Sequence, residues 1–397
     1  MRISTPQIFS QSLNQINSSL IDVAKLNSIN SSQKKLNSPS DDPFGMGTVI
    51  ELRGYDKTLS GYVNNCKTAA ESLSLADDIL LQASEIITAA REQAEQAASE
   101  TYTAAQLQMM ADEMASYLDS LMTMANTQMG TDSIFGGDSL DSTAYEMGLG
   151  VTMTNDSLSN ASFVSIEGEL DSAVVSVRLG TDGVIGTDEI EYSYSTDGGE
   201  TWTSATLAAG DTVLDLGSCQ VELAAGTAVT EADGDGEGTE FIVRKAAVYT
   251  GSDTAMTVAI SGSSTVAMTT VGSSVFGGVD QSGAGYGEPN LFETISNCIA
   301  FMETGNHAGV AACLDELRSA QESLEAANAN IGARENKVTY TSEAISQVRT
   351  ITGNSISRVE DADAAQILVE LEQANYVYEA VLTSSASIMR MSLLDYI

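Results

Sequence analysis

The C-terminal stretch that decides the fold runs from Ser357 to Ile397 and reads SRVEDADAAQILVELEQANYVYEAVLTSSASIMRMSLLDYI. Its apolar residues recur at steps of three and four, the spacing that places side chains on one face of a helix. This stripe consists of Ile367, Leu368, Leu371, Ala374, Tyr378, Val381, Leu382, Ile388 and Met389. We therefore expect a helix that continues to the C-terminus. Because a terminal helix frays unless its apolar face is covered, the stripe also predicts a partner elsewhere in the chain.

The expected partner is the N-terminal segment, whose apolar residues repeat the same spacing. The charges of the two ends are complementary, because residues 1–40 carry four basic side chains and one acidic one, whereas residues 360–397 carry seven acidic and one basic. Exposed ion pairs add only about 0 to 1 kcal/mol each, so the apolar stripes matter more. The predicted assembly interface comprises Phe9, Leu13, Ile16, Leu20, Val23, Leu368, Leu371, Tyr378, Leu382, Met389, Leu393 and Leu394.

The composition indicates a folded chain with room for two or three domains. Its 397 residues are 43% hydrophobic, and the mean hydropathy is −0.02. The formal net charge of −38 repels phosphate, so nucleic acid, anionic membrane surfaces and anionic substrates are disfavoured partners. The first residues lack the apolar run of a cleaved secretory signal, and no stretch approaches the about 18 apolar residues of a membrane span.

Helical sequence flanks a central segment of a different kind. Residues 63–129 keep one apolar face and have few glycines, and an unbroken helix of that length would be roughly 100 Å long. Prolines end the first helix at residues 36–43. After Leu291 the helical pattern resumes, with a break expected at residues 305–309 and possible relief at Gly332 and Gly353.

The central segment predicts β structure. Residues 130–287 contain 25 of the 33 glycines, and period-two alternation at residues 174–179, 190–194 and 241–244 indicates strands between glycine and aspartate turns. Between residues 131 and 243 there are 22 acidic side chains and one basic side chain, Arg178. This insert must therefore face water.

The order helix, strand, helix predicts a mainly α fold with an inserted β domain. We expect a long antiparallel α-helical bundle formed by both chain ends, with the β-rich domain at its tip. The predicted domains are a terminal coiled coil of residues 1–43 and 350–397, a helical rod of residues 44–130 and 289–349, and a surface-exposed β-rich insert of residues 131–288.

Short motifs in the helical parts resemble the flagellin superfamily. The loop Asn37-Ser38-Pro39-Ser40-Asp41-Asp42-Pro43 resembles its Asn-Pro-Ser-Asp-Asp-Pro loop, with Ser38 where proline is commoner. Residues 330–336 (NIGAREN), 357–363 (SRVEDAD) and 391–397 (MSLLDYI) resemble three segments of the returning helices, and residues 133–137 (SIFGG) resemble the strand that leaves the first long helix. The resemblance covers about residues 1–140 and 289–397. The ending Asp-Tyr-Ile, where flagellin usually has Leu-Leu-Arg, favours the hook-associated members of the superfamily.

This resemblance implies a structural protein of the bacterial flagellum, not an enzyme, that joins hook to filament through its paired terminal helices. It implies self-association in a ring, neighbouring hook-associated protein and flagellin as partners, and an export chaperone. It also implies export through the flagellar type III channel to the cell exterior, without a cleaved signal peptide. The alternative within the same class is a minor flagellin of the filament.

Residues 195–202, STDGGETW, fit the Asp-box pattern Ser-x-Asp-x-Gly-x-Thr-Trp, which is best known from sialidase propellers as a hairpin signature. In this motif the aspartate accepts backbone hydrogen bonds in a tight turn, and the tryptophan packs beneath it. One copy cannot make a propeller, which needs repeated blades. We expect Ser195, Asp197, Gly199, Thr201 and Trp202 to form a structural hairpin. The alternative is a glycan contact through Trp202, which would make the chain a carbohydrate-binding adhesin or a glycosidase.

The remaining candidates favour neither catalysis nor a metal or cofactor. Residues 233–237, DGDGE, offer oxygen ligands for calcium but lack the glutamate that completes an EF-hand loop. The only histidine, His307, lies in a turn between helices, and the methionines of residues 109–124 indicate core packing. The four cysteines are expected to be free thiols, and on one continuous helix Cys298 and Cys313 would lie about 22 Å apart.

Overall fold

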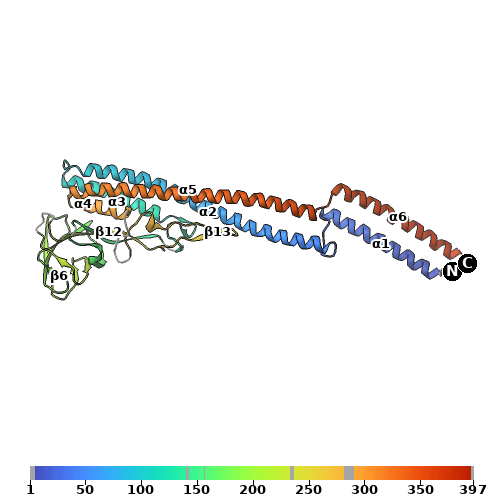
Figure 1. The fold of residues 1–397 in the computed structure, drawn as a ribbon, viewed down its shortest axis with the longest axis horizontal. Helices are drawn as coiled ribbons and strands as arrows, with labels where there is room; N and C mark the ends of the chain where they lie inside the picture. The colour runs from blue at the N-terminus through green and yellow to red at the C-terminus, as the bar shows by residue number, and fades with distance from the viewer. Residues whose placement is uncertain (1–4, 140–142, 156, 233–236, 281–289, 395–397) are drawn as a thin grey trace. The chain divides into compact units, whose positions relative to one another are not determined.

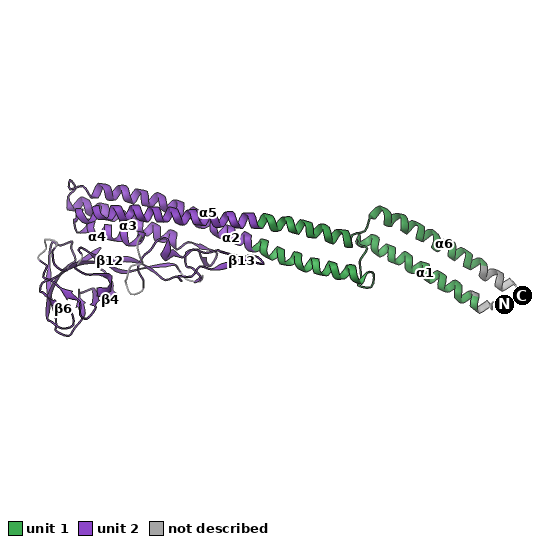
Figure 2. Cartoon of the chain, viewed as in Figure 1, with its two compact units in different colours: residues 1–64, 342–397 green, residues 65–341 purple. Residues whose placement is uncertain are grey.

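The computed structural model describes residues 5–139, 143–155, 157–232, 237–280 and 290–394. The chain falls into two compact units, residues 1–64 with 342–397 (unit 1) and residues 65–341 (unit 2), which are coloured separately in Figure 2. Two long helices, α2 (Pro43–Ala97) and α5 (His307–Glu360), contribute to both units. The mainly α fold with an inserted β region is confirmed. The finer division into three domains stays a prediction.

Unit 1 is built from the two ends of the chain. Helices α1 (Thr5–Ser32) and α6 (Ala364–Leu394) lie side by side and run antiparallel, as Figure 1 shows. The rest of the unit comes from the first part of α2 and the last part of α5. Pro43 is the first residue of α2, a position where its missing N–H costs no hydrogen bond. The predicted pairing of the chain ends is therefore confirmed.

The prediction of one helix from Ser357 to the C-terminus was wrong, because α5 ends at Glu360 and α6 begins at Ala364. The Oδ1 atom of Asp363 accepts the backbone N–H groups of Ala365 and Gln366 at 2.9 and 3.2 Å. Asp363 thus acts as the N-cap of a new helix. Residues 332 and 353, the glycines at which relief was expected, lie inside α5 without interrupting it.

The expected continuous helix over residues 63–129 is also interrupted. Helix α2 ends at Ala97, and α3 (Ala104–Ala125) starts after a short turn. Thr103 caps α3 in a capping box, in which its backbone N–H donates to Gln106 Oε1 at 2.9 Å. This hydroxyl-rich turn has no glycine or proline to mark it in the sequence.

The helical core of unit 2 comes from α2, α3, α5 and the short helix α4 (Leu291–Glu303). Along α2 the buried residues follow a regular three-and-four repeat in which alanine alternates with larger side chains, and α3 and α5 supply leucines and methionines against it. Small alanines let helices approach closely while the larger residues fill the space between them. The apolar residues that α2 contributes to this core are Cys66, Ala69, Leu73, Ala76, Ile79, Leu80, Ala83, Ile87, Ala90, Ala94 and Ala97.

The largest sheet of unit 2 is antiparallel and has the strand order β3-β12-β5-β7-β8. The predicted strands at residues 174–179, 190–194 and 241–244 all belong to it. Val243 of β12 lies opposite Val151 of β3 on one side and Val175 of β5 on the other. The five strands are β3 (Tyr145–Met153), β12 (Glu240–Tyr249), β5 (Val174–Leu179), β7 (Ile190–Ser195) and β8 (Thr203–Leu207).

Smaller sheets and turns complete unit 2. A three-stranded sheet has the order β4-β10-β9, and three two-stranded ladders pair β1 with β2, β6 with β11 and β13 with β14. The bounds are β1 (Gln128–Met129), β2 (Asp132–Ser133), β4 (Phe163–Gly168), β6 (Gly183–Val184), β9 (Val213–Asp215), β10 (Cys219–Leu223), β11 (Ala228–Val229), β13 (Thr257–Ser261) and β14 (Ser264–Ala267), with 3₁₀ turns at Asn160–Ser162 and Gly272–Ser274.

Strand β12 is buried on both faces because it lies between two cores. Phe241 and Val243 point into a second core shared with the three-stranded sheet, where the rings of Phe163 and Phe241 are 5.3 Å apart. On the other face Arg244 is fully buried and pairs with Glu293 of α4 at 3.0 Å. Alternation with period two is therefore kept, but both faces are covered along most of the strand, and Lys245 is its one exposed residue.

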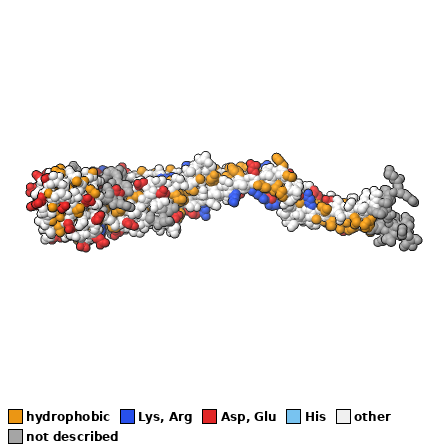
Figure 3. All heavy atoms as spheres, turned by 90° about the horizontal axis from the view of Figure 1, so that it is seen from below, with side chains coloured by type: hydrophobic (Ala, Val, Ile, Leu, Met, Phe, Trp, Pro, Cys, Tyr) orange, Lys and Arg blue, Asp and Glu red, His pale blue; other side chains and the backbone are white. Residues whose placement is uncertain are grey.

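The surface of the β-rich part carries many carboxylates, as Figure 3 shows, in agreement with the prediction of a water-facing insert. Among the helices within the described residues, none combines the length and apolar character needed to cross a membrane.

Candidate assembly interface

Helices α1 and α6 shield one stripe of each other, which we call the seam. On each helix the shielded positions alternate at steps of three and four, as in a coiled coil. Serine occupies several of them, and Ser19 and Ser385 are only 7% and 5% exposed. The seam consists of Ser12, Ile16, Ser19, Val23, Leu26 and Ile29 on α1 and of Ile367, Leu371, Ala374, Tyr378, Val381 and Ser385 on α6.

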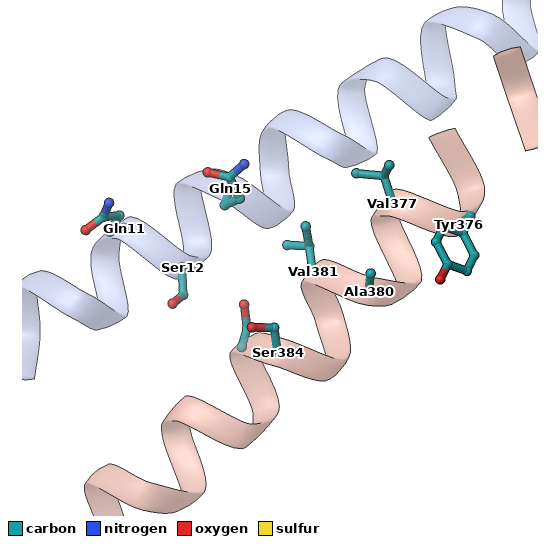
Figure 4. A pocket seen from close by; sticks show the side chains of 9 residues that line it. Gln11, Ser12, Gln15, Tyr376, Val377, Ala380, Val381 and Ser384 are labelled. Carbon is teal, nitrogen blue, oxygen red and sulfur yellow. The ribbon is translucent and has the colours of Figure 1, made fainter. Parts of the chain in front are cut away.

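The seam is incompletely filled. A hollow of about 530 Å³ opens between the helices, and Figure 4 shows Ser12 on α1 and Val381 and Ser384 on α6 among its labelled lining residues. Small side chains at these positions leave space that well-packed protein interiors do not tolerate. The two helices alone therefore do not bury all of their facing surface.

The structure divides the predicted interface residues between two faces. Four of them, Ile16, Val23, Leu371 and Tyr378, are half-buried in the seam. Another five lie outside it with their side chains exposed: Phe9, Leu13, Leu20, Leu368 and Leu382. The side chains of Met389, Leu393 and Leu394 lie outside the described residues.

The exposed apolar residues form what we call the outer flank of α1 and α6. Phe9 is 49% exposed and Leu20 48%, although both are large hydrophobic side chains. Figure 3 shows hydrophobic side chains along this part of the chain. The outer flank consists of Phe9, Leu13, Leu20 and Ile21 on α1 and of Leu368, Val369, Tyr376, Val377 and Leu382 on α6. Large apolar patches left open on a chain mark surfaces for other proteins.

Reasoning from hydrophobicity missed the serines of the seam. Ser12 and Ser19 lie seven residues apart, as do Ile16 and Val23, so together they form one heptad-like stripe. That spacing was the available signal. The signal was obscured because serine occupies two positions of the α1 stripe, Ser12 and Ser19, whereas the residues of the outer flank are larger and apolar.

The loop between α1 and α2 is organised by Asp41. Its Oδ2 atom accepts the backbone N–H groups of Asn37 and Ser38 at 3.1 and 2.8 Å, as well as the Ser38 hydroxyl at 3.1 Å. The hydrogen bond from the Ser38 backbone is the main cause that holds the pKa of Asp41 below its ordinary value. Asp42 Oδ1 accepts the N–H of Phe44 at 3.1 Å, at the start of α2. Both aspartates of the predicted motif thus fix the turn, between Pro39 and Pro43.

Glu360 joins three segments of unit 1 at the end of α5. Its side chain is only 6% exposed, and its carboxylate pairs with Lys34 Nζ at 2.6 Å and with Arg53 Nη2 at 2.6 and 2.7 Å. Its backbone carbonyl accepts the N–H of Lys35 at 2.8 Å. One residue therefore connects the end of α5 to the segment after α1 and to α2.

Replacing Glu360 with glutamine should destabilise unit 1. The amide keeps the shape but removes the charge that compensates Lys34 and Arg53, so we expect the free energy of unfolding to fall by about 1 to 3 kcal/mol. Chemical denaturation followed by circular dichroism measures this difference.

The matched control is Glu343→Gln, an exposed glutamate on the same helix. It should change the free energy of unfolding by less than about 0.5 kcal/mol. Equal destabilisation by both variants would contradict the role given to Glu360.

In unit 2 the Asp-box residues form the turn between β7 and β8. Asp197 accepts the N–H of Thr201 at 2.9 and 3.0 Å and the hydroxyls of Thr201 and Ser195 at 2.5 and 2.7 Å. Ser195 Oγ accepts the N–H of Gly199 at 2.9 Å. Gly198 and Gly199 have φ angles of 75° and 100°, which side chains rarely adopt. All of these hydrogen bonds join residues of the motif to one another.

Trp202 makes contacts through one face of its ring and through its ring nitrogen. Its Nε1–H donates to the carbonyl of Gly199 at 3.0 Å, and the Arg178 guanidinium lies 4.1 Å from its ring centroid. Arg178 also pairs with Glu240 at 3.0 Å. A sugar that stacked on this ring face would have to displace Arg178, so the geometry favours a structural hairpin over a glycan contact.

Asp197→Asn should lower the melting temperature of unit 2 in a pH-dependent way. Hydrogen bonds from Thr201, first from its hydroxyl, hold the pKa of Asp197 far below its ordinary value. A lowered folded-state pKa adds stability that is present above the unfolded value of about 3.9 and is lost as the pH falls through the folded value. The deficit of the variant should be largest near neutral pH and should shrink below about pH 4.

Thermal melts between pH 3 and pH 7 check this expectation. Asp211→Asn, an exposed aspartate in another turn, serves as control and should show no such pH trend. A constant deficit for Asp197→Asn at all pH values would argue against a role for its ionised form.

The other predicted candidates have local structural roles. His307 is the first residue of α5, and its Nδ1 lies 2.9 Å from the carbonyl oxygen of Ala97 at the end of α2. Met114 and Met122 are buried, whereas Met109 is exposed. Residues 233–236 of the calcium candidate lie outside the described residues. Over the part of the chain that the structure describes, no group of three or more potential ligands is placed to hold a metal ion.

Comparison with protein families identifies two similarities at the chain ends. Residues 3–139 match the bacterial flagellin N-terminal helical region, and residues 314–397 match the bacterial flagellin C-terminal helical region. A curated relative is flagellar hook-associated protein 3 of Salmonella typhimurium, which is 27% identical over 151 residues. The match covers 38% of this chain and 48% of the relative, so the chain spans about half the length of that relative.

Solved structures with a similar course of the chain come from the same group of proteins. A flagellar hook-associated protein from Vibrio parahaemolyticus has a TM-score of 0.48 and 16% identity, covering 81% of this chain and 100% of that one. FlgL from Bacillus cereus has a TM-score of 0.43 and 12% identity, covering 76% of this chain and 97% of that one.

Proposed function

Because the chain belongs to the bacterial flagellin family and carries both of its helical regions, we propose that it is a structural protein that joins the flagellar hook to the filament. It performs this role without catalysis, by self-association through α1 and α6. The name of the Salmonella relative supports a position at the hook.

The outer flank is the observation that carries this proposal. Two helices can cover only one stripe of each other, and here each helix also exposes large apolar residues outside that stripe. Burying such side chains contributes about 1.5 to 3 kcal/mol each relative to leaving them exposed. A neighbouring copy that covers the outer flank would therefore supply the contacts that a single chain lacks.

Order in the terminal helices is coupled to this association. The seam holds serines and a hollow, while fixing each residue of a helix costs about 1 to 2 kcal/mol of backbone entropy. The isolated pair is thus marginally stable, and packing against neighbours shifts it toward the folded state.

The partners follow from the same proposal. Copies of the chain form a ring, with a neighbouring hook-associated protein on one side and flagellin on the other. An export chaperone covers the terminal segments before the chain passes unfolded through the flagellar type III channel to the cell exterior. Terminal helices of marginal stability are compatible with this export, because little folded structure has to be unfolded first.

Removing the gene should leave cells with hooks, without filaments, and with flagellin released into the medium. Electron microscopy of the cells and detection of flagellin in the supernatant measure this outcome. Normal filaments in the mutant would contradict the proposal. Immunogold labelling separates the minor-flagellin alternative, which places label along the whole filament instead of at the junction.

Substituting the outer flank should abolish assembly without unfolding the monomer. Leu13→Gln with Leu20→Gln removes about 1 to 2 kcal/mol of burial per residue, since each is already partly covered, and weakens association by about 30- to 1,000-fold. The variant should be found in the medium but should not restore filaments to the mutant.

Ser18→Gln is the matched control, because it places the same side chain at an exposed polar position of α1. It should restore filaments fully. Restoration by the double variant, at equal levels of secreted protein, would show that the outer flank is dispensable.

A further inference from the structure

Two cysteines expected to lie far apart meet in the helical core of unit 2. The sequence prediction of about 22 Å assumed one continuous helix, which was wrong because α4 ends at Glu303 and α5 begins at His307. The turn folds α5 back on α4. Cys298 lies five residues before the end of α4, and Cys313 lies six residues after the start of α5. The two thiols are therefore at matching heights on facing helices, and both are buried in the same hydrophobic core.

The helices approach closely one turn away from this pair. A Cβ atom added to Gly309 of α5 would lie 2.5 Å from ring atoms of Phe301 of α4, so the ring packs directly against the backbone at that position. Gly309 precedes Cys313 by four residues and Phe301 follows Cys298 by three, which places each pair on one helix face. A close approach of the backbones is what a disulfide needs, because its Cα atoms must come within about 7 Å.

From this geometry we propose that Cys298 and Cys313 form a reversible disulfide that links α4 to α5 once the chain leaves the reducing cytoplasm. The location outside the cell rests on the proposed function. The close placement of the two cysteines does not rest on the proposed function. Disulfides persist in oxidising surroundings and are reduced in the cytosol, so the pair is free inside the cell and joined outside it.

The oxidant is a small-molecule disulfide, and the exchange balances in two steps. The thiolate of one cysteine attacks a sulfur of the small disulfide, which forms a mixed disulfide and releases one small thiol. The neighbouring cysteine then attacks the protein sulfur of that mixed disulfide, forms the Cys298–Cys313 bond and releases the second small thiol. The two protons of the cysteines leave on the two released thiols.

Burial controls when this exchange occurs. Cys298 and Cys313 are 0% and 2% exposed. The hydrogen bond to Cys298, followed by burial, raises the pKa of the Cys313 thiol far above its ordinary value. Little Cys313 thiolate is present in the folded chain and both sulfurs are shielded from reagents, so exchange is slow unless α4 and α5 separate. The bond thus forms as the chain folds outside the cell and is afterwards shielded from reductants.

The test treats the reduced full-length protein with oxidised glutathione, with and without urea below the unfolding midpoint. Digestion after Glu303 separates the two cysteines into different peptides, which stay joined only by a disulfide. Mass spectrometry should recover this linked pair, with faster formation in urea. Cys66 and Cys219 should remain free, and the linked protein should melt about 5 to 10 °C higher than the reduced one.

Two variants keep the test decisive. Cys66→Ser leaves the pair intact and should form the link, whereas Cys298→Ser should not. Recovery of Cys298 and Cys313 as separate glutathione adducts, or as free thiols after exposure in urea, would overturn the proposal. So would an unchanged melting temperature of the linked protein.

Discussion

A pair of helices can bury only one stripe of each partner, and this limit governs unit 1. Besides the seam, α1 and α6 each carry large apolar side chains on other parts of their surface, and these remain uncovered in the pair. The observed pairing uses the stripe that contains small serines, and it leaves the larger side chains of the outer flank outside. In the proposed assembly, these larger side chains are the ones that contacts between chains would cover.

In the remainder of unit 1, two carboxylates fix the turns that lead into the helix pair. Glu360 and Asp41 fix the two turns that connect α1 and α6 to the longer helices, each through several hydrogen bonds to one carboxylate. Hydrogen bonds to charged groups are stronger than neutral ones, so these two residues fix the geometry of both turns. The aspartates of the loop motif and the glutamate of the returning segment therefore have a physical reason for their positions.

The sequence was sufficient to predict the pairing of the chain ends, the inserted β region and three strands of its main sheet, because periodicity directly reports which side chains are covered. It did not indicate the breaks after Ala97 and Glu360. Both breaks depend on capping by Thr103 and Asp363, and neither contains the glycine or proline that marks a turn. The order of the strands could not be predicted from the sequence either. Strands β3 and β12 pair across about ninety residues of chain, and such a pairing leaves no local signal in the sequence. The Asp-box turn was predictable because all of its contacts are local.

The β insert begins after α3 and returns at α4, two helices that pack against each other. Asn126, just past α3, exchanges hydrogen bonds with the backbone of Tyr145 at 2.8 and 2.9 Å, and the Tyr145 ring lies 4.8 Å from that of Phe292 in α4. Tyr145 thus contacts both the segment where the polypeptide leaves the helices and the helix at which it returns. Parts of the insert that do not pack on the helices, such as the three-stranded sheet, can lengthen, shrink or be exchanged over evolutionary time with little effect on the helical frame, because the cost of closing a loop grows only slowly with its length. This outlying part of the insert is therefore free to diversify, while the strands that share the helical core are constrained by their packing.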